Sequence, residues 1–234
     1  MRVLISPDIH GRSFWKESVE KHLDDCDKII FLGDYMDPYG YEKIDYSEAM
    51  SNFVQIINFA DKHNDKVILL LGNHDVHYIS SEAERSSRFS LWHSREIRAI
   101  FKDDISLFKI AAEFTINKER FLFTHAGVVS SWYDKYKNKI GELSADNLNK
   151  LITGKADNYD ILTEVGRIRG GWNICGGPLW ADVVEHIENK PIDGIYQIFG
   201  HTQLKDNPYI TDNFACLDCR RAFILNNEGK INEL

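Results

Sequence analysis

The sequence predicts an α/β fold with a mainly parallel core sheet, and two observations carry this prediction. Short apolar runs rich in β-branched and aromatic residues recur along the chain, and a helical pattern lies between two of them. Five runs are interpreted as buried strands, at residues 3–5, 29–32, 67–71, 121–123 and 195–199. Strand–helix–strand alternation is typical of sheets whose parallel strands are joined by crossover helices.

The predicted crossover helix lies between the second and third of these strands. Five apolar side chains recur there at helical spacing: Ala49, Met50, Phe53, Ile57 and Ala60. This spacing places them on one face of an amphipathic helix, with Asp45 or Ser47 near its start.

Length and composition favour one large domain covering residues 1–234. The chain is 43% hydrophobic and 27% charged, which is ordinary for a globular protein. No repeat, low-complexity tract or linker marks a boundary. Two stretches interrupt the alternation, near residues 78–105 and 132–177, and both are predicted to be helical insertions over one end of the sheet.

The charge and the cysteines restrict the class of protein. A formal net charge of -8 argues against general nucleic-acid binding and against a membrane-surface protein, because no basic field is available. The apolar runs are too short to span a membrane, and the first residues do not form a signal peptide. We therefore expect a cytoplasmic protein with reduced cysteines. Cys216 and Cys219 form one CxxC pair, interpreted as structural, with metal binding as the alternative.

A polar cluster follows each of the five predicted strands. Each contains a carboxylate, an imidazole or an amide, and usually a glycine: Asp8-Ile9-His10-Gly11, Gly33-Asp34-Tyr35-Met36-Asp37, Gly72-Asn73-His74-Asp75, Thr124-His125-Ala126-Gly127 and Gly200-His201-Thr202. In parallel α/β sheets ligands bind outside the carboxyl ends of the strands, so we expect these clusters to converge on one edge. Each cluster alone is a weak signal, but five in succession point to a functional site.

The other histidines have no such context. They are interpreted as structural residues: His22, His63, His77, His93 and His186.

Five motifs of this chain, over residues 8–202, resemble those of the calcineurin-like metallophosphoesterases. They are DIHG, GDYMD, GNHD, THAG and GHT. The chain looks closest to the phosphoprotein phosphatase branch, including its bacterial relatives that act on phosphoproteins or dinucleoside polyphosphates. The resemblance implies a pair of packed β-sheets flanked by helices, a four-layer α/β/β/α sandwich.

The resemblance also implies two divalent metal ions held by six residues. Asp8, His10 and Asp34 match the first metal site. Asp34 would bridge to the second site, which Asn73, His125 and His201 would complete. Oxygen and imidazole ligands without thiolate suit manganese, iron or zinc better than calcium. A water held between two such ions gives a hydroxide nucleophile near neutral pH.

The histidine of the GNHD motif has a separate role in the family. By resemblance, His74 protonates the leaving oxygen and a carboxylate orients it. Asp37 matches the orienting position, and the adjacent Asp75 is the alternative.

The candidate phosphate-binding arginines depart from the family pattern. The family's Asp-Arg-Gly is replaced by Asp37-Pro38-Tyr39, so one arginine of the phosphate clamp is absent. Arg169 matches the second clamp position, with Arg167 as a substitute. Arg12 follows the first motif and could reach the phosphate or lie on the surface.

These observations predict a phosphoesterase that acts on a small phosphorylated substrate or a dinucleoside polyphosphate. A serine/threonine protein phosphatase acting on phosphopeptides is the alternative, disfavoured by the missing arginine. A nuclease is disfavoured by the acidic charge. A scaffold that retained the fold and lost catalysis would lack ligands or the acid, and all seven positions are present here.

Overall fold

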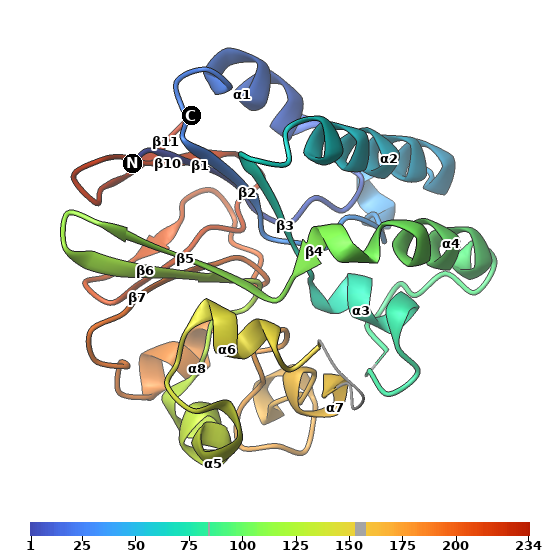
Figure 1. Cartoon of the computed structure of the whole chain (residues 1–234). Helices are drawn as coiled ribbons and strands as arrows, with labels where there is room; N and C mark the ends of the chain where they lie inside the picture. Colours follow the sequence, from blue (N-terminus) through green and yellow to red (C-terminus); the bar gives the residue numbers. More distant parts are fainter. Residues whose placement is uncertain (84, 153–157) are drawn as a thin grey trace. The chain divides into compact units, whose positions relative to one another are not determined.

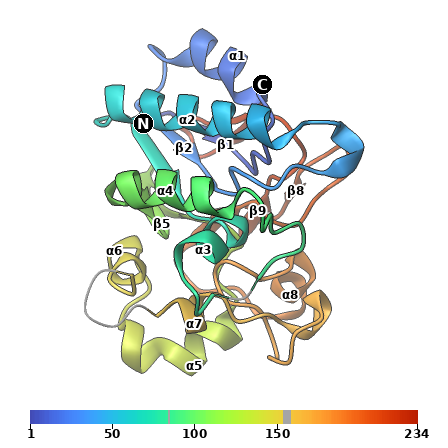
Figure 2. The same ribbon diagram turned by 90° about the vertical axis from the view of Figure 1, so that its right-hand side faces the viewer.

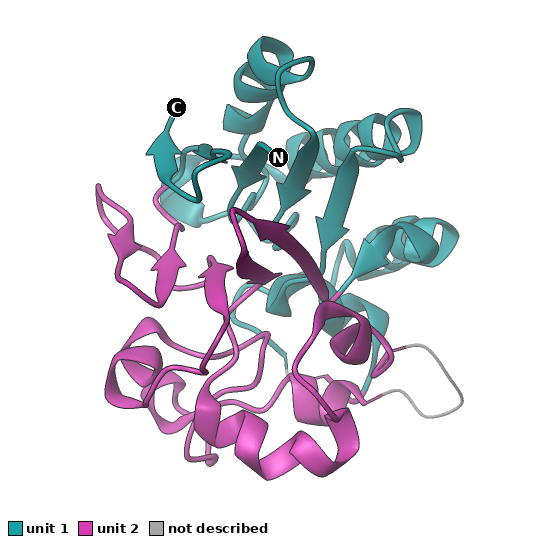
Figure 3. Ribbon diagram, turned by 60° about the vertical axis from the view of Figure 1, so that its left-hand side comes forward, with its two compact units in different colours: residues 1–81, 85–109, 220–234 teal, residues 82–84, 110–219 magenta. Residues whose placement is uncertain are grey.

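Each of two units of the chain is built around one β-sheet (Figure 3). The computed structural model describes residues 1–83, 85–152 and 158–234. Unit 1 comprises Met1–Ser81, Arg85–Lys109 and Arg220–Leu234, and unit 2 comprises Glu82–Glu84 and Ile110–Cys219. The prediction of one domain with two helical insertions stays a prediction.

The sheet of unit 1 has six strands in the order β11-β10-β1-β2-β3-β4. Strands β1 (Val3–Ser6), β2 (Lys28–Phe31), β3 (Val67–Leu70) and β4 (Phe108–Lys109) are parallel. Strands β10 (Phe223–Leu225) and β11 (Ile231–Glu233) are antiparallel additions at one edge. All four residues of β1 are buried, as expected for a strand covered on both faces.

Four α-helices belong to unit 1: α1 (Phe14–His22), α2 (Tyr46–Lys62), α3 (Asn73–Ile79) and α4 (Ser94–Asp104). Helices α1 and α2 lie together on one side of the sheet (Figure 1, Figure 2). Helix α2 is the predicted crossover helix, and Asp45 is its N-cap, because its side chain accepts the Glu48 N–H. Phe53 of this helix packs against Tyr35, with ring centres 4.9 Å apart.

The sheet of unit 2 has five strands in the order β5-β6-β7-β9-β8. Strands β6 (Glu119–Thr124), β7 (Tyr196–Phe199) and β9 (Phe214–Cys216) are parallel. Strands β5 (Ala111–Ile116) and β8 (Tyr209–Ile210) pair antiparallel at the two edges.

The helices of unit 2 gather on one side of its sheet (Figure 1). They are α5 (Ser130–Ile140), α6 (Ala145–Asn149), α7 (Tyr159–Leu162) and α8 (Val183–Glu188). Trp132 of α5 is buried, and its indole N–H donates to the carbonyl oxygen of Ile161 at 3.0 Å. This hydrogen bond ties α5 to α7.

Two mixed sheets flanked by helices confirm the predicted α/β fold class. All five predicted strands are present, but they are divided between the sheets, three in unit 1 and two in unit 2. The expectation that all five strands end at the same edge of one sheet was therefore wrong. Strands β5 and β6 pair antiparallel and belong to a second sheet. The pattern of apolar runs in the sequence does not show which strands pair with one another. Among the described residues, no helix is both long and apolar enough to cross a membrane.

Candidate active site and metal centre

The loops that follow β1, β2 and β3 carry the candidate site of unit 1. They lie side by side because these strands are parallel neighbours, and their backbones pair: the His10 N–H donates to the carbonyl oxygen of Asp34 at 2.6 Å. Asp8, His10, Asp34 and Asn73 are all buried, with exposed fractions of 1–2%. Four polar side chains are thus brought together without access to bulk water.

Glycine is required where the loops after β2 and β3 meet. A Cβ on Gly72 would lie 2.1 Å from Asp34 Oδ1 and 2.7 Å from the Asp34 backbone nitrogen. On the facing loop, Gly33 has a φ of +107°, and a Cβ there would lie 2.5 Å from the Gly72 nitrogen. The glycines of the two motifs therefore permit a close backbone approach that positions Asp34.

The backbone is strained at several candidate site residues. Among the described residues, nine that are not glycine have a positive φ. Four of them are predicted site residues: His10 (44°), Asp34 (56°), Asp37 (59°) and His201 (64°). Such conformations cost about 1–3 kcal/mol each and concentrate at functional sites.

His10 and Asp34 have the properties of metal ligands. His10 Nδ1 lies 2.9 Å from the carbonyl oxygen of Met36, so it is the donor and Nε2 carries the lone pair. That Nε2 lies 3.4 Å from Asp34 Oδ2. Burial lowers the pKa of His10 well below its usual value, and the neighbouring His74 lowers it further. The imidazole is therefore neutral, as a metal ligand must be.

The charge around Asp34 also fits a cation. Burial raises the pKa of Asp34 well above its usual range, and repulsion from Asp8 acts in the same direction. Two buried carboxylates beside a neutral imidazole favour a bound divalent cation, which would offset both burial and repulsion. The residues present in unit 1 therefore fit the first metal site.

Asn73 begins helix α3 at the end of β3. Its amide Nδ2 donates to Ser86 Oγ at 2.7 Å, and Ser86 Oγ donates back to the carbonyl oxygen of Asn73 at 3.1 Å. This pair of hydrogen bonds fixes the amide plane and identifies Oδ1 as the oxygen that would meet a metal ion.

His125 and His201 are the candidate ligands of unit 2. They follow β6 and β7, which are parallel neighbours, and both are buried. His125 Nε2 and His201 Nδ1 face each other at 3.1 Å. Two imidazole nitrogens that converge in this way fit a shared cation, since imidazole is a common ligand of manganese, iron and zinc.

His74 is held by Asp37. His74 Nδ1 lies 2.8 Å from Asp37 Oδ2, whereas the Asp75 carboxylate accepts backbone N–H groups from Gly72, Asp34 and Tyr35 at 2.7–3.0 Å. Asp75 therefore holds the two loops together, and the geometry favours Asp37 as the carboxylate that orients His74.

Asp37 accepts from more partners than the sequence indicated. Its Oδ2 lies 2.9 Å from His77 Nε2, and its Oδ1 accepts from the hydroxyls of Tyr78 at 2.6 Å and Tyr46 at 3.1 Å. Burial alone would raise the pKa of Asp37, but hydrogen bonds from His74 and His77 outweigh it and lower the pKa. Asp37 is thus an ionised carboxylate in a buried network.

Three residues of this site were not predicted from the sequence: His77, Tyr46 and Tyr78. One sequence signal could have identified the histidine. His77 lies three residues after His74, which places both on one face of α3. Its Nδ1 accepts the backbone N–H of Ser86 at 3.2 Å, so Nε2 carries the proton, and this nitrogen lies 2.9 Å from Asp37 Oδ2. A protonated Nε2 is not a metal ligand, so we assign His77 to the support of Asp37.

Burial lowers the pKa of His74 to about 4, against the opposing effect of Asp37. The other ring nitrogen, Nε2, lies 3.2 Å from Arg88 Nη2. His74 is thus a buried imidazole with one nitrogen on a carboxylate and the other beside a cation.

The three predicted substrate arginines differ in their surroundings. Arg12 Nε contacts both oxygens of Glu42 at 2.9–3.0 Å, so its charge is already matched. Arg169 Nε lies 2.7 Å from Asp182, and its Nη2 donates to Thr202 Oγ1 at 2.9 Å, next to His201 in the chain. Arg167 is exposed. Arg169 is therefore the one held beside a candidate metal ligand.

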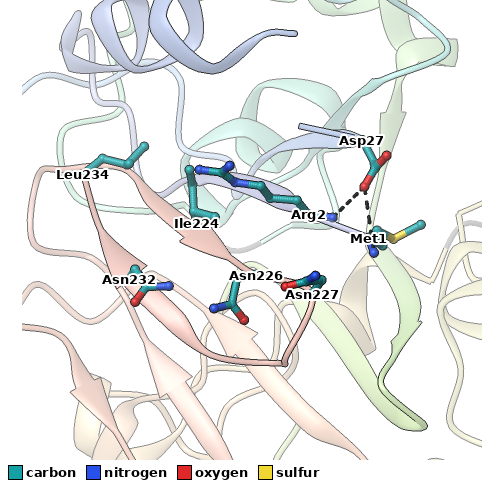
Figure 4. A pocket seen from close by; sticks show the side chains of 8 residues that line it. All are labelled: Met1, Arg2, Asp27, Ile224, Asn226, Asn227, Asn232 and Leu234. Atoms are coloured by element: carbon teal, nitrogen blue, oxygen red, sulfur yellow. Dashed lines mark hydrogen bonds and ion pairs between the residues drawn. The ribbon is translucent and has the colours of Figure 1, made fainter. Parts of the chain in front are cut away.

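Two other features do not contribute candidate site residues. Cys216 and Cys219 are buried free thiols, and Cys216 Sγ donates to the carbonyl oxygen of Gly200 at 3.3 Å. A pocket of about 530 Å³ in unit 1 is lined by residues near both chain ends and by Asp27, which pairs with the N-terminal amine (Figure 4). None of its lining residues is a candidate for catalysis or metal binding.

The fold and the clusters of carboxylate, amide and imidazole at its strand ends are those of a metal-binding hydrolase. The chain belongs to the calcineurin-like phosphoesterase family, whose sequence model matches residues 1–211. A search of the curated proteins found no match.

Two solved structures share the fold. The chain is similar to a protein serine/threonine phosphatase from Saccharomyces cerevisiae, described as having similarity to human phosphatase PP5, with a TM-score of 0.57, 14% identity and coverage of 100% of this chain and 79% of the other. It is also similar to a metallophosphoesterase from Sphaerobacter thermophilus, with a TM-score of 0.51, 11% identity and coverage of 100% and 88%.

Proposed function

We propose that this metallophosphoesterase hydrolyses phosphate esters or pyrophosphate bonds of a small phosphorylated substrate or a dinucleoside polyphosphate. The observation that carries the proposal is the pairing of His74 with Asp37 at 2.8 Å, within a unit that also holds the His10–Asp34 cluster. An oriented proton donor beside a metal-ligand set is the arrangement that phosphate ester hydrolysis requires.

We propose that six residues hold two divalent ions, with Asp34 as the shared ligand: Asp8, His10, Asp34, Asn73, His125 and His201. When bound, manganese, iron or zinc would supply positive charge to the phosphoryl oxygens and acidify the attacking water. Asp34 is suited to bind both metal ions because its two carboxylate oxygens point in different directions. Its Oδ1 accepts the backbone N–H of His74 at 2.8 Å, and its Oδ2 faces His10.

His74 would deliver a proton to the leaving oxygen from Nε2. Asp37 receives Nδ1–H, which directs Nε2 away from Asp37 and stabilises the charged ring. The burial that lowers the pKa of His74 would be offset by a bound phosphate, because a negative group at Nε2 favours the protonated imidazole.

A serine/threonine protein phosphatase is the second candidate, since one similar fold is that of such an enzyme. The replacement of the clamp arginine by Pro38 argues for a substrate other than a phosphoprotein. The four free thiols are compatible with a reducing cytoplasm, which is where we propose the enzyme acts.

Metal dependence tests the proposed function. Chelated protein should be inactive, and manganese or iron should restore hydrolysis better than calcium does. The panel should compare nucleotides, dinucleoside polyphosphates, sugar phosphates and phosphopeptides, with metal content measured in parallel. Turnover that survives exhaustive chelation with no detectable metal would exclude the proposed mechanism, and turnover confined to phosphopeptides would favour the protein phosphatase.

The shared ligand can be tested with two variants. Asp34→Asn should reduce the content of both metal ions, whereas His10→Ala should chiefly reduce one. Equal loss of a single ion in the two variants would contradict the shared position of Asp34.

A further inference from the structure

Arg88 reaches the candidate site of unit 1 from the segment between α3 and α4. Its Nε donates to the carbonyl oxygen of Asp37 at 3.0 Å, although the two residues lie 51 positions apart in the sequence. Its Nη2 lies 3.2 Å from His74 Nε2 and 3.5 Å from His10 Nε2. One guanidinium group therefore faces the nitrogen that would protonate a leaving oxygen and a candidate metal ligand.

An aromatic ring supports this guanidinium. Its carbon lies 3.8 Å from the centre of the Tyr39 ring, a close cation–π contact. Tyr39 stands in the loop where the family pattern has Asp-Arg-Gly and this chain has Asp37-Pro38-Tyr39. The loop that lacks the clamp arginine thus supplies the Tyr39 ring, which packs against the guanidinium of Arg88.

The backbone of Arg88 is also held in a specific conformation. Its φ is 69°, in the left-handed region, like those of His10, Asp34 and Asp37. The Tyr46 hydroxyl lies 2.7 Å from the carbonyl oxygen of Arg88 and 3.1 Å from Asp37 Oδ1. The network that positions Asp37 therefore positions Arg88 as well.

We propose that Arg88 binds the phosphoryl group of the substrate and replaces the clamp arginine that is absent at position 38. This inference rests on the proposed phosphoesterase function. An ester whose leaving oxygen meets His74 Nε2 has its phosphoryl oxygens within reach of the guanidinium, because Nη2 is 3.2 Å from that nitrogen. A planar guanidinium can donate two parallel hydrogen bonds to such a group.

The surroundings of Arg88 favour this role over that of Arg12. Arg12 is matched by the carboxylate of Glu42, whereas Arg88 contacts a carbonyl oxygen, two imidazoles and an aromatic ring. None of these four partners is a carboxylate, and the guanidinium also acts electrostatically on the nearby Asp34.

The test is the affinity of variants for inorganic phosphate, measured by calorimetry on manganese-loaded protein and as a competitive inhibition constant. Arg88→Ala should weaken phosphate binding by about 10- to 100-fold, the value of one charge-assisted hydrogen bond. Arg88→Lys should recover part of this loss, since it keeps the charge without the planar fork. Tyr39→Leu should give a smaller loss, of about 2- to 10-fold.

Arg85→Ala is the matched control. Arg85 lies on the same segment, and its guanidinium also stands over an aromatic ring, that of Phe89, at 5.1 Å. It should bind phosphate as the wild type does. Metal content should be equal in all variants and each should remain folded, which separates anion binding from loss of structure.

Wild-type phosphate affinity in a folded, fully metallated Arg88→Ala or Arg88→Lys protein would overturn the inference, as would the absence of phosphate binding by the wild type. If phosphate binding depends on Arg88 but no ester is hydrolysed, the inference stands and the proposed function fails. If esters are hydrolysed and Arg88→Ala keeps the wild-type affinity, the proposed function stands and the inference fails.

Discussion

At the scale of single residues, two neighbouring carboxylates have separate tasks. Asp37 accepts from side chains and contacts the His74 ring, whereas Asp75 accepts from the backbone of two loops. Burial raises the pKa of Asp75 well above its usual range, and the charge of Asp34 raises it further. Asp75 is therefore a structural group, although it lies next to His74 in the chain.

Substitution of His74 should separate good leaving groups from poor ones. Nitrophenolate leaves with little help from a proton, but an alkoxide needs one, and general-acid catalysis is worth about 10²–10⁴-fold. His74→Asn should therefore lose far more activity on alkyl phosphates than on nitrophenyl phosphate, with metal content unchanged. The measurement is the ratio of kcat/KM on the two substrates.

Carboxylate variants supply the comparison. Asp37→Asn should show a weaker form of the same ratio change, since the imidazole remains. Asp75→Asn should lower stability and leave the ratio as in the wild type. Equal losses on both substrates together with loss of one metal ion would instead make His74 a ligand.

At the scale of secondary-structure elements, the site of unit 1 depends on how closely the ends of β2 and β3 approach. The contact requires Gly72 to lack a side chain, because the space of a Cβ is taken by Asp34 Oδ1. Neighbouring parallel strands bring the loops together, and the glycine lets them touch.

Gly72→Ala should therefore displace Asp34. We expect a loss of metal content and a fall in stability of about 2 kcal/mol or more, because the methyl group meets backbone atoms that cannot move away easily. Gly40→Ala is the control, since a Cβ on Gly40 has no atom within 4 Å. Elemental analysis and urea denaturation would check both variants, and wild-type metal content in Gly72→Ala would refute the explanation.

At the scale of the whole molecule, metal binding at the proposed ligands would stabilise the fold. Asp8 and Asp34 are buried carboxylates that repel each other, so the fold without a cation contains an unfavourable charge arrangement. A ligand that binds the folded state alone stabilises it in proportion to the logarithm of its concentration.

Removal of metal should lower the melting temperature by about 5–10 °C, relative to protein with metal at roughly a hundredfold above its Kd. Asp34→Asn should reduce this difference and raise the melting temperature of the metal-free protein, because a neutral amide removes the repulsion. Calorimetry with and without manganese gives both quantities. An identical melting temperature in the two conditions would show that metal does not bind the folded state selectively.

The sequence was sufficient for five of the strands and the main crossover helix, and it placed the candidate ligands at strand ends, because these signals are local. Apolar runs mark the strands, and a motif such as Gly72-Asn73-His74 lies within a few residues of a strand end. The resemblance to a known family supplied the second sheet, which the apolar pattern alone did not.

The network around Asp37 could not be predicted in the same way. Tyr46, Tyr78 and Arg88 reach it from separate segments through tertiary contacts, and none of them belongs to a motif. A tyrosine or an arginine in a polar helical stretch has the same local pattern whether it faces solvent or a buried carboxylate. Only the packing of the chain distinguishes these cases.

The left-handed backbone at His10, Asp34, Asp37, Arg88 and His201 has a consequence for how this chain can evolve. Glycine adopts such a conformation without strain, so random drift towards glycine would relax the fold at each of these positions. A polar side chain at each of these five positions therefore carries a backbone cost that glycine would avoid.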